Sequence, residues 1–241
     1  MTTKLKAGEM LVETRVHQVE LNGLRFQYRE TGDVSAPSLV ALHALGQNAQ
    51  SWDQVAAVLS KKYRVLALDQ RGHGGSARPG EYSFDLMSED LYLFANALGL
   101  ERFTLLGHSM GGTVSYLFSE THPSRVERLV VEDTPPPFLD KPLNIPPEPS
   151  EPLPFDYLVV PSIFQQLNEP NPLWWARLSD ISAPTLIVGG GSTSHIPQEK
   201  LRDVAKLIPD CELVTIEGAG HNVHFANLDH FLDVVTRFLD A

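Results

Sequence analysis

The sequence predicts an α/β protein, with a mostly parallel sheet of eight strands and helices on both of its faces. Two observations carry this prediction. Strand-like apolar runs alternate with amphipathic stretches along the chain, which is the pattern of strand–helix–strand units. In addition, 42% of the 241 residues are hydrophobic, which suffices for one large domain with an extensive core. We therefore expect residues 1–241 to form a single domain.

Eight short segments have the composition of strands. The first two flank Asn22 and Gly23, a dipeptide typical of a two-residue hairpin turn, so an antiparallel pair opens the predicted sheet. The other six are short apolar runs of the kind found in buried parallel strands. The predicted strands are residues 16–21, 25–30, 38–42, 63–68, 102–106, 126–131, 184–188 and 212–216.

Amphipathic stretches between and after these strands predict helices. Residues 84–98 form one clear example. The C-terminal stretch is clearer, because its apolar residues recur every three or four positions, as on one face of a helix. These residues are Phe225, Leu228, Leu232, Val235 and Leu239.

The segment 135–180 breaks the alternation of strands and helices. Twelve of the 18 prolines lie between Pro135 and Pro172, and this density excludes long helices up to about residue 154. Short helices remain feasible over 157–167 and 173–178. Because the segment also carries several aromatic side chains, we expect a small, irregular lid inserted after the sixth core strand rather than a disordered linker.

Composition restricts the partners and the compartment. A formal net charge of −11 disfavours nucleic acid, because phosphates would be repelled. The single cysteine, Cys211, allows no internal disulfide and is expected to be a packed, inert thiol. The N-terminus lacks the apolar region of a signal peptide, and no run is long enough for a membrane span. We expect a cytoplasmic protein that acts on a small molecule, without a membrane partner; nothing in the composition specifies an oligomeric state.

Residues Gly107-His108-Ser109-Met110-Gly111 form a Gly-x-Ser-x-Gly motif between a strand-like and a helix-like run. This context predicts a tight strand-to-helix turn that exposes the Ser109 hydroxyl at the edge of the sheet. A Cβ atom at either flanking glycine would collide with the neighbouring strand or helix. The turn also aims free N–H groups of the helix at an oxyanion. Ser109 is therefore the candidate nucleophile.

Around this motif the chain resembles the α/β-hydrolase fold superfamily, and among its members the small-lid serine hydrolases of the esterase and lactonase type. Three further segments carry the resemblance. Leu42–Gly46 (LHALG) is similar to the oxyanion loop, Asp69–Ser76 (DQRGHGGS) to a segment common in single-domain members, and Gly218–His224 (GAGHNVH) to the loop of the catalytic histidine.

A serine hydroxyl needs a base to accept its proton during attack. His221 is the candidate base, because its glycine-flanked loop follows a strand and can reach over the sheet edge. His224, three residues later, is expected to pack under the loop or cap the last helix. His43 and His108 resemble family positions that shape the site without transferring protons, and His73, in its Arg-Gly-His-Gly turn, is expected to be structural.

The third member of the triad departs from the family pattern. Most relatives carry an aspartate after the seventh strand, but residues 186–194 (LIVGGGSTS) contain no carboxylate, and the next acid, Glu199, falls in an expected helix. Some members place the acid after the sixth strand instead, where this chain has Asp133. The resemblance and strand parity imply that Asp133 orients His221. Glu132, or a serine–histidine site supported only by hydroxyl groups, are the alternatives.

The resemblance also assigns the oxyanion hole to the backbone N–H groups of Leu45 and Met110. No metal or cofactor is expected, because the histidines lack HExxH spacing and no Cys-His cluster exists. Gly189–Gly191 likewise lacks the later glycine and the acid of a dinucleotide-binding motif.

Together these features imply a cofactor-independent serine hydrolase that cleaves a carboxylic ester or lactone through an acyl-enzyme. The same triad serves C–C bond hydrolysis, lyase and perhydrolase reactions elsewhere in the superfamily, and the fold does not separate these. The missing carboxylate after the seventh strand also leaves open a non-catalytic ligand-binding receptor. Epoxide and haloalkane hydrolysis are disfavoured, because those relatives use an aspartate where Ser109 stands.

Overall fold

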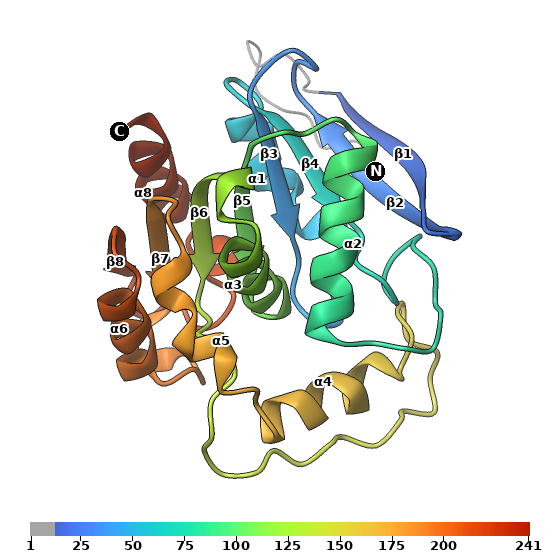
Figure 1. Ribbon diagram of the computed structural model, residues 1–241, viewed down its shortest axis with the longest axis vertical. Helices are drawn as coiled ribbons and strands as arrows, with labels where there is room; N and C mark the ends of the chain where they lie inside the picture. Colours follow the sequence, from blue (N-terminus) through green and yellow to red (C-terminus); the bar gives the residue numbers. More distant parts are fainter. Residues whose placement is uncertain (1–12) are drawn as a thin grey trace.

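The computed structural model describes residues 13–241. Its central feature is an eight-stranded sheet with the order β1-β2-β4-β3-β5-β6-β7-β8 (Figure 1). β2 is antiparallel to both β1 and β4, and the other neighbouring strands are parallel. The strands are β1 (Thr14–Leu21), β2 (Leu24–Thr31), β3 (Ser38–Leu42), β4 (Arg64–Leu68), β5 (Phe103–His108), β6 (Val126–Glu132), β7 (Thr185–Gly189) and β8 (Cys211–Thr215).

The sheet confirms the fold class expected from the sequence, and each strand end lies within two residues of its predicted position. The hairpin turn is the two-residue type, because Leu21 pairs with Leu24 and both Asn22 (φ 49°) and Gly23 (φ 77°) have positive φ. Residues 1–12 lie outside the described residues. They include most of the N-terminal segment for which the sequence predicts no signal peptide.

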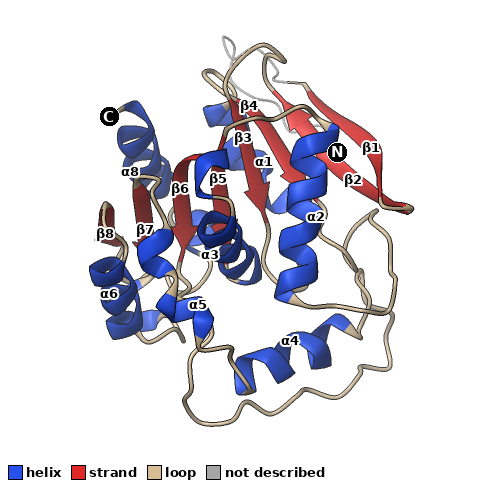
Figure 2. Cartoon of the chain, in the orientation of Figure 1, coloured by secondary structure: helices blue, strands red, loops and turns tan. Residues whose placement is uncertain are grey.

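Helices cover both faces of the sheet (Figure 2). Along β3, Val40 and Leu42 belong to one apolar core, which they share with α2, α3 and α6, whereas Leu39 and Ala41 belong to a second core with α1 and α8. This alternation follows from the two-residue period of a strand that is buried on both faces. The helices are α1 (Asp53–Leu59), α2 (Phe84–Ala97), α3 (Met110–Thr121), α4 (Val159–Asn168), α5 (Leu173–Ala176), α6 (Gln198–Leu207), α7 (Val223–Ala226) and α8 (Leu228–Asp240).

The expectation of one continuous C-terminal helix from Phe225 is wrong. Asn227 has a non-helical backbone (φ −146°, ψ 66°) and separates the short α7 from α8. Phe225 is 51% exposed, while Leu232 and Val235 of α8 are buried in the core. The physical reason is that α7 is held by contacts of its own at the end of β6, described below, so its direction is not set by α8.

The proline-rich segment follows β6 and passes beyond the carboxyl ends of the central strands, where α4 crosses the molecule (Figure 1). Val159 and Ile163 of α4 are buried in the core. At the end of α4, the Asn168 side chain bonds both the N–H (2.7 Å) and the carbonyl (2.9 Å) of Leu143 in the preceding loop. No helix within residues 13–241 is long and apolar enough to cross a membrane.

Candidate active site

Ser109 occupies the tight turn between β5 and α3. Its backbone lies at φ 52° and ψ −116°, a conformation that residues with a side chain rarely adopt. A Cβ added at Gly107 would lie 2.4 Å from the carbonyl oxygen of Gly111, and one at Gly111 would lie 2.4 Å from that of Leu42. Both flanking positions therefore require glycine, because α3 packs directly on β5 and β3.

Two buried histidines fix the loop that follows β3. The Nε2 atom of His43 accepts the Gln70 N–H at 3.0 Å, and that of His73 accepts the Gly46 N–H at 3.2 Å. Burial lowers the pKa of His43 to about 4 and that of His73 to about 3. Both rings stay neutral near pH 7 and can act as acceptors, so their role is to set the backbone of this loop.

This loop and the start of α3 place two N–H groups beside Ser109. Met110 is the first residue of α3, so its N–H has no partner within the helix. Within residues 13–241, the N–H groups of Leu45 and Met110 donate no hydrogen bond. Both residues line one cavity together with Ser109. Both N–H groups are therefore free to donate to a group bound in this cavity.

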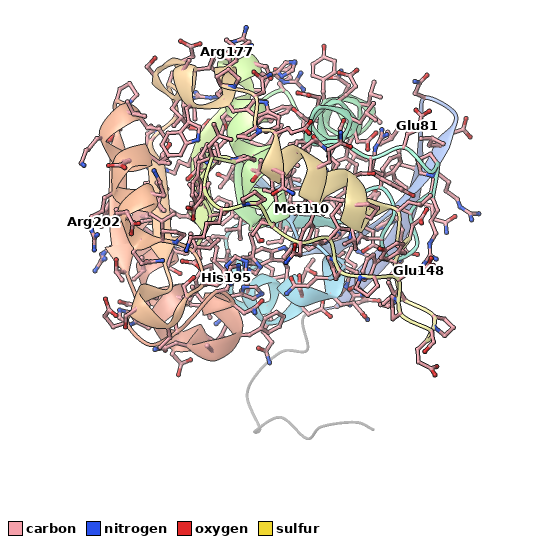
Figure 3. The ribbon with its side chains drawn as sticks, turned by 90° about the horizontal axis from the view of Figure 1, so that it is seen from below. Glu81, Met110, Glu148, Arg177, His195 and Arg202 are labelled. Atoms are coloured by element: carbon pink, nitrogen blue, oxygen red, sulfur yellow. The ribbon has the colours of Figure 1, made fainter. Side chains whose placement is uncertain are left out.

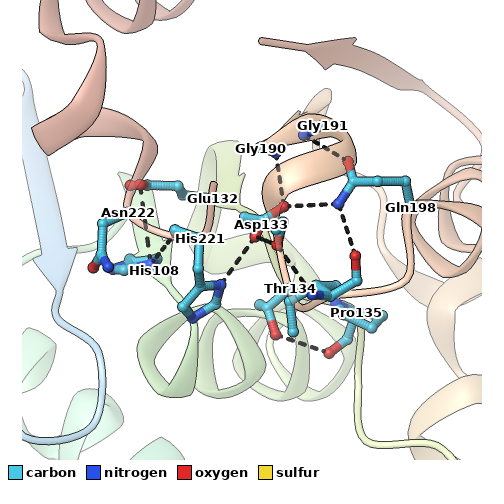
Figure 4. Close-up of polar contacts among 12 residues, drawn as sticks. His108, Glu132, Asp133, Thr134, Pro135, Gly190, Gly191, Gln198, His221 and Asn222 are labelled. Carbon is cyan, nitrogen blue, oxygen red and sulfur yellow. Dashed lines mark hydrogen bonds and ion pairs between the residues drawn. The ribbon is translucent and has the colours of Figure 1, made fainter. Parts of the chain in front are cut away.

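Asp133 lies directly after β6, at φ 43°, and is fully buried. Its carboxylate Oδ2 lies 2.9 Å from Nδ1 of His221, the pairing implied by the resemblance (Figure 4). A carboxylate only accepts hydrogen bonds, so the proton of His221 resides on Nδ1 and its Nε2 is left free to act as a base.

Three further donors hold the same carboxylate. The Gly190 N–H (2.7 Å) and the Gln198 side-chain amide (3.1 Å) donate to Oδ1 (Figure 4). The Ser194 hydroxyl donates to Oδ2. All three come from the segment after β7 that lacks an acid. The sequence analysis did not identify Ser194 and Gln198 as part of the site. The one feature that could have indicated them is the run of polar side chains after β7, where most relatives carry an aspartate.

Ser192, the other serine of that segment, turns away from Asp133. Its hydroxyl lies 3.4 Å from Glu217. Among residues 13–241, no hydrogen bond joins the Ser109 hydroxyl to the His221 ring. Catalytic hydrogen bonds are often long or poorly aligned until substrate binds, so Ser109 and His221 remain candidates for direct proton transfer.

Glu132, the neighbour of Asp133, holds the other end of the histidine loop. Its carboxylate accepts the His224 N–H at 3.0 Å and the His224 Nδ1 at 2.7 Å. Burial alone would raise the pKa of Glu132, but the nearby His108 and His224 lower it below the usual range. Nε2 of His108 lies 2.8 Å from the carbonyl oxygen of His221. Two consecutive acids thus anchor His221 and His224 separately.

His108, Glu132 and His224 also bring three possible metal ligands within 4.8 Å of one another, a grouping that sequence spacing does not reveal. In this structure, however, both Glu132 oxygens are engaged by Nδ1 of His224, at 2.7 and 2.9 Å. Nε2 of His108 faces the His221 carbonyl oxygen, whereas Nδ1 of His108 and Nε2 of His224 are buried without a partner among the described residues.

The cavity next to Ser109 has a volume of about 240 Å³. The wall of the cavity is largely apolar. It is formed by the tight turn at Ser109, by the proline-rich segment with α4, and by the loop after β7. Its apolar lining residues include Leu45, Phe84, Met110, Pro135, Pro136, Pro137, Phe138, Ile163 and Leu167, and its polar lining residues are Ser109, Thr113, Thr134, Asp140, Lys141 and His195.

Comparisons with known proteins agree with this architecture. Residues 37–151 match the family model described as the alpha/beta hydrolase fold. The sn-1-specific diacylglycerol lipase ABHD11 of Mus musculus is 28% identical over 86% of this chain and 82% of its own. Epoxide hydrolase 3 of Xenopus tropicalis is 35% identical, but over 48% of this chain and 32% of its own.

Among solved structures, a hydrolase from Pseudomonas aeruginosa PA01 superimposes with a TM-score of 0.82 at 25% identity. The match covers 98% of this chain and 100% of the other. Together with the eight-stranded sheet and the tight turn at Ser109, these likenesses show that the chain has the alpha/beta hydrolase fold.

Proposed function

We propose that this protein is a cofactor-independent serine hydrolase that cleaves a carboxylic ester or lactone through an acyl-enzyme. One observation carries the proposal: the Ser109 elbow opens into an apolar cavity within a fold that also pairs His221 with the buried Asp133 at 2.9 Å. Hydrolases, including a lipase, among the relatives support ester cleavage.

In the proposed mechanism, Ser109 Oγ attacks the substrate carbonyl while His221 Nε2 takes its proton. The N–H groups of Leu45 and Met110 hold the oxyanion, each contributing roughly 3 kcal/mol of transition-state stabilisation. His221 then gives the proton to the departing alcohol. Water, activated by the same ring, cleaves the acyl-enzyme and restores Ser109. Asp133 keeps His221 in the required tautomer throughout.

The cavity supports an apolar acyl or alcohol group as the bound part of the substrate. Phe84, Ile163, Leu167 and a run of three prolines are among the apolar residues of its wall. We also propose that residues 135–180 act as the lid of this cavity, since the prolines and two of these apolar residues come from that segment.

Two alternatives from the sequence lose support. The argument for a non-catalytic receptor rested on the missing carboxylate after β7, and Asp133 supplies a carboxylate at the His221 ring from β6 instead. Epoxide or haloalkane hydrolysis is disfavoured because serine, not aspartate, stands at position 109. C–C bond hydrolysis, lyase and perhydrolase chemistry would use the same residues and are left to experiment.

The test combines labelling with a substrate panel. A fluorophosphonate probe is expected to label Ser109 rapidly in the wild type, slowly in His221→Ala, and not in Ser109→Ala. p-Nitrophenyl esters of graded acyl length, with several lactones, then define the substrate class. Loss of the serine hydroxyl is expected to lower kcat by about 10⁴-fold or more. A tenth of the activity surviving in Ser109→Ala, or no labelling of the wild type, would refute the proposal.

A further inference from the structure

The loop after β7 holds its own backbone firmly against Asp133. The Ser194 hydroxyl donates to the Asp133 carboxylate and accepts the Ile196 N–H at 3.0 Å. The Gln198 amide donates both to Asp133 (3.1 Å) and to the Ile196 carbonyl (3.0 Å). His195 lies between Ser194 and Ile196, so these four hydrogen bonds fix the position of its backbone relative to the catalytic groups.

The His195 side chain forms part of the cavity wall together with Ser109 and Met110. Its ring centroid lies 4.3 Å from that of His221, with the two rings inclined by 60°. The residue remains accessible to solvent. In a view onto this end of the molecule, it lies on the side of Met110 nearer to α6 (Figure 3). It can therefore meet a bound substrate beside His221.

The position of His221 identifies which part of the substrate His195 would meet. In the proposed reaction His221 protonates the departing alcohol, so the alcohol lies on the His221 side of the scissile bond. The acyl carbonyl faces Leu45 and Met110 on the other side. A ring packed against His221 and exposed in the cavity thus borders the alcohol group.

The charge state of His195 restricts what it can recognise. Partial burial and the neighbouring His221 lower the pKa of His195, so the ring is uncharged near pH 7. A neutral imidazole offers one donor and one acceptor, which suits a hydroxyl group better than a carboxylate. Apart from Ser109, the other polar lining residues in the described part of the chain are Thr113, Thr134, Asp140 and Lys141, and the remaining lining residues are apolar.

We propose that His195 determines specificity for the leaving group, by hydrogen bonding a second hydroxyl on the alcohol part of the ester. The preferred substrates are thus monoesters of diols or polyols. This inference rests on the proposed ester hydrolysis at Ser109. The loop after β7, which lacks the aspartate that most relatives carry there, thus takes part in substrate recognition.

The test compares two esters that share an acyl group, ethyl butyrate and 2-hydroxyethyl butyrate. For the wild type, kcat/KM is expected to favour the hydroxyethyl ester by about fivefold to tenfold, the size of one net neutral hydrogen bond. In His195→Phe, which keeps a packed ring, the ratio is expected to fall to about one. His195→Gln, which keeps a donor and an acceptor, is expected to restore part of it.

The matched control is His230→Phe, because His230 is an exposed histidine of α8 outside the site; its ratio should equal that of the wild type. A ratio unchanged in His195→Phe would overturn the proposal. If kcat/KM also falls by the same factor for both esters, His195 only supports His221. Fluorophosphonate labelling of Ser109 is read in the same samples. Absent labelling refutes the hydrolase itself, whereas normal labelling with an unchanged ratio refutes only the role of His195.

Discussion

At the scale of single residues, Asp133 is the side chain on which the site depends most. It has a positive φ and full burial, and its carboxylate accepts from His221 and three other donors. A left-handed conformation at a non-glycine residue costs of order 1–3 kcal/mol and persists only where its surroundings enforce it. Here the donors of the β7 loop provide that constraint.

Asp133→Asn is expected to lower kcat by roughly 10²- to 10⁴-fold, because an amide can hold the wrong tautomer of His221. Ser194→Ala should reduce kcat less, by up to about tenfold, since the other donors to Asp133 remain. Ser192→Ala is the matched control and should be mild, because that hydroxyl faces Glu217. Steady-state kinetics on one p-nitrophenyl ester measure all three. Near-normal kcat in Asp133→Asn would contradict its role as the triad acid.

At the scale of elements, the loop from His221 to His224 divides two tasks between its two histidines. His221 faces Asp133, while the His224 ring is buried between Glu132 and Trp52, stacked on the latter at 4.4 Å. Removing the donor that a buried carboxylate accepts from leaves that acceptor unsatisfied, which typically costs about 1–3 kcal/mol of folding free energy and more for a charged group.

His221→Ala should abolish activity with little change in stability, because three other donors still hold the Asp133 carboxylate. His224→Ala should lower the free energy of unfolding by about 1–3 kcal/mol or more, because Glu132 loses its donor, yet the folded fraction should keep most of its kcat. Urea unfolding and kinetics on the same preparations separate the two effects. Equal losses of kcat with unchanged unfolding free energies would contradict this division.

The far end of α3 carries another buried acid, Glu120. Glu120 lies within the last turn of α3, its Oε1 has no partner within the described residues, and burial raises its pKa to about 8. The unfolded chain has an ordinary carboxyl pKa of about 4.3, so the folded state binds the extra proton between these values. Stability contributed by the protonated group is lost as pH rises from about 5 to 8.

Glu120→Gln keeps the shape and removes this titration. Its Tm is expected to exceed that of the wild type by a margin that grows with pH up to about 8 and is nearly constant above it. Glu89→Gln, an exposed acid on α2, is the matched control. Thermal melts in a pH series measure the margin. A margin independent of pH would show that Glu120 is not the buried titrating group.

At the scale of the whole molecule, the lid and the core meet through a few polar contacts around the cavity. The Tyr82 hydroxyl lies 2.5 Å from the Asp156 carboxylate, just before α4, and the Phe84 N–H donates to Gln166 of α4 at 3.0 Å. Because α4 supplies Ile163 and Leu167 to the cavity wall, these contacts set the shape of the substrate site.

Tyr82→Phe is expected to raise KM for long-acyl esters by about threefold to tenfold, since it removes one hydrogen bond to a charged group. The effect on an acetate ester should be smaller, because a short acyl group makes fewer contacts with the lid. Tyr92→Phe, on α2 and packed against His122, is the matched control. Equal changes in KM for short and long esters would argue against a lid that shapes the acyl site.

The sequence by itself determined the features that neighbouring residues specify. The strand and helix periods, the hairpin at Asn22-Gly23 and the glycines around Ser109 are local constraints, and the structure has each of them. The break at Asn227 was missed, because a helical period continues across it and only the anchoring of His224 on Glu132 reveals it.

The partners of the site were decided by the tertiary structure. Asp133 meets His221 across 88 positions of the chain, Ser194 meets Asp133 across 61, and His224 meets Glu132 across 92. The order and register of β5, β6 and β7 bring these residues to one sheet edge, and no local pattern encodes that register. For Asp133 the resemblance to a known family supplied the missing long-range information. For Ser194, Gln198 and His195, no feature of the sequence supplied this information. The hydrogen-bond donors of their loop acquire a role only once the Asp133 carboxylate beside them has been located in space.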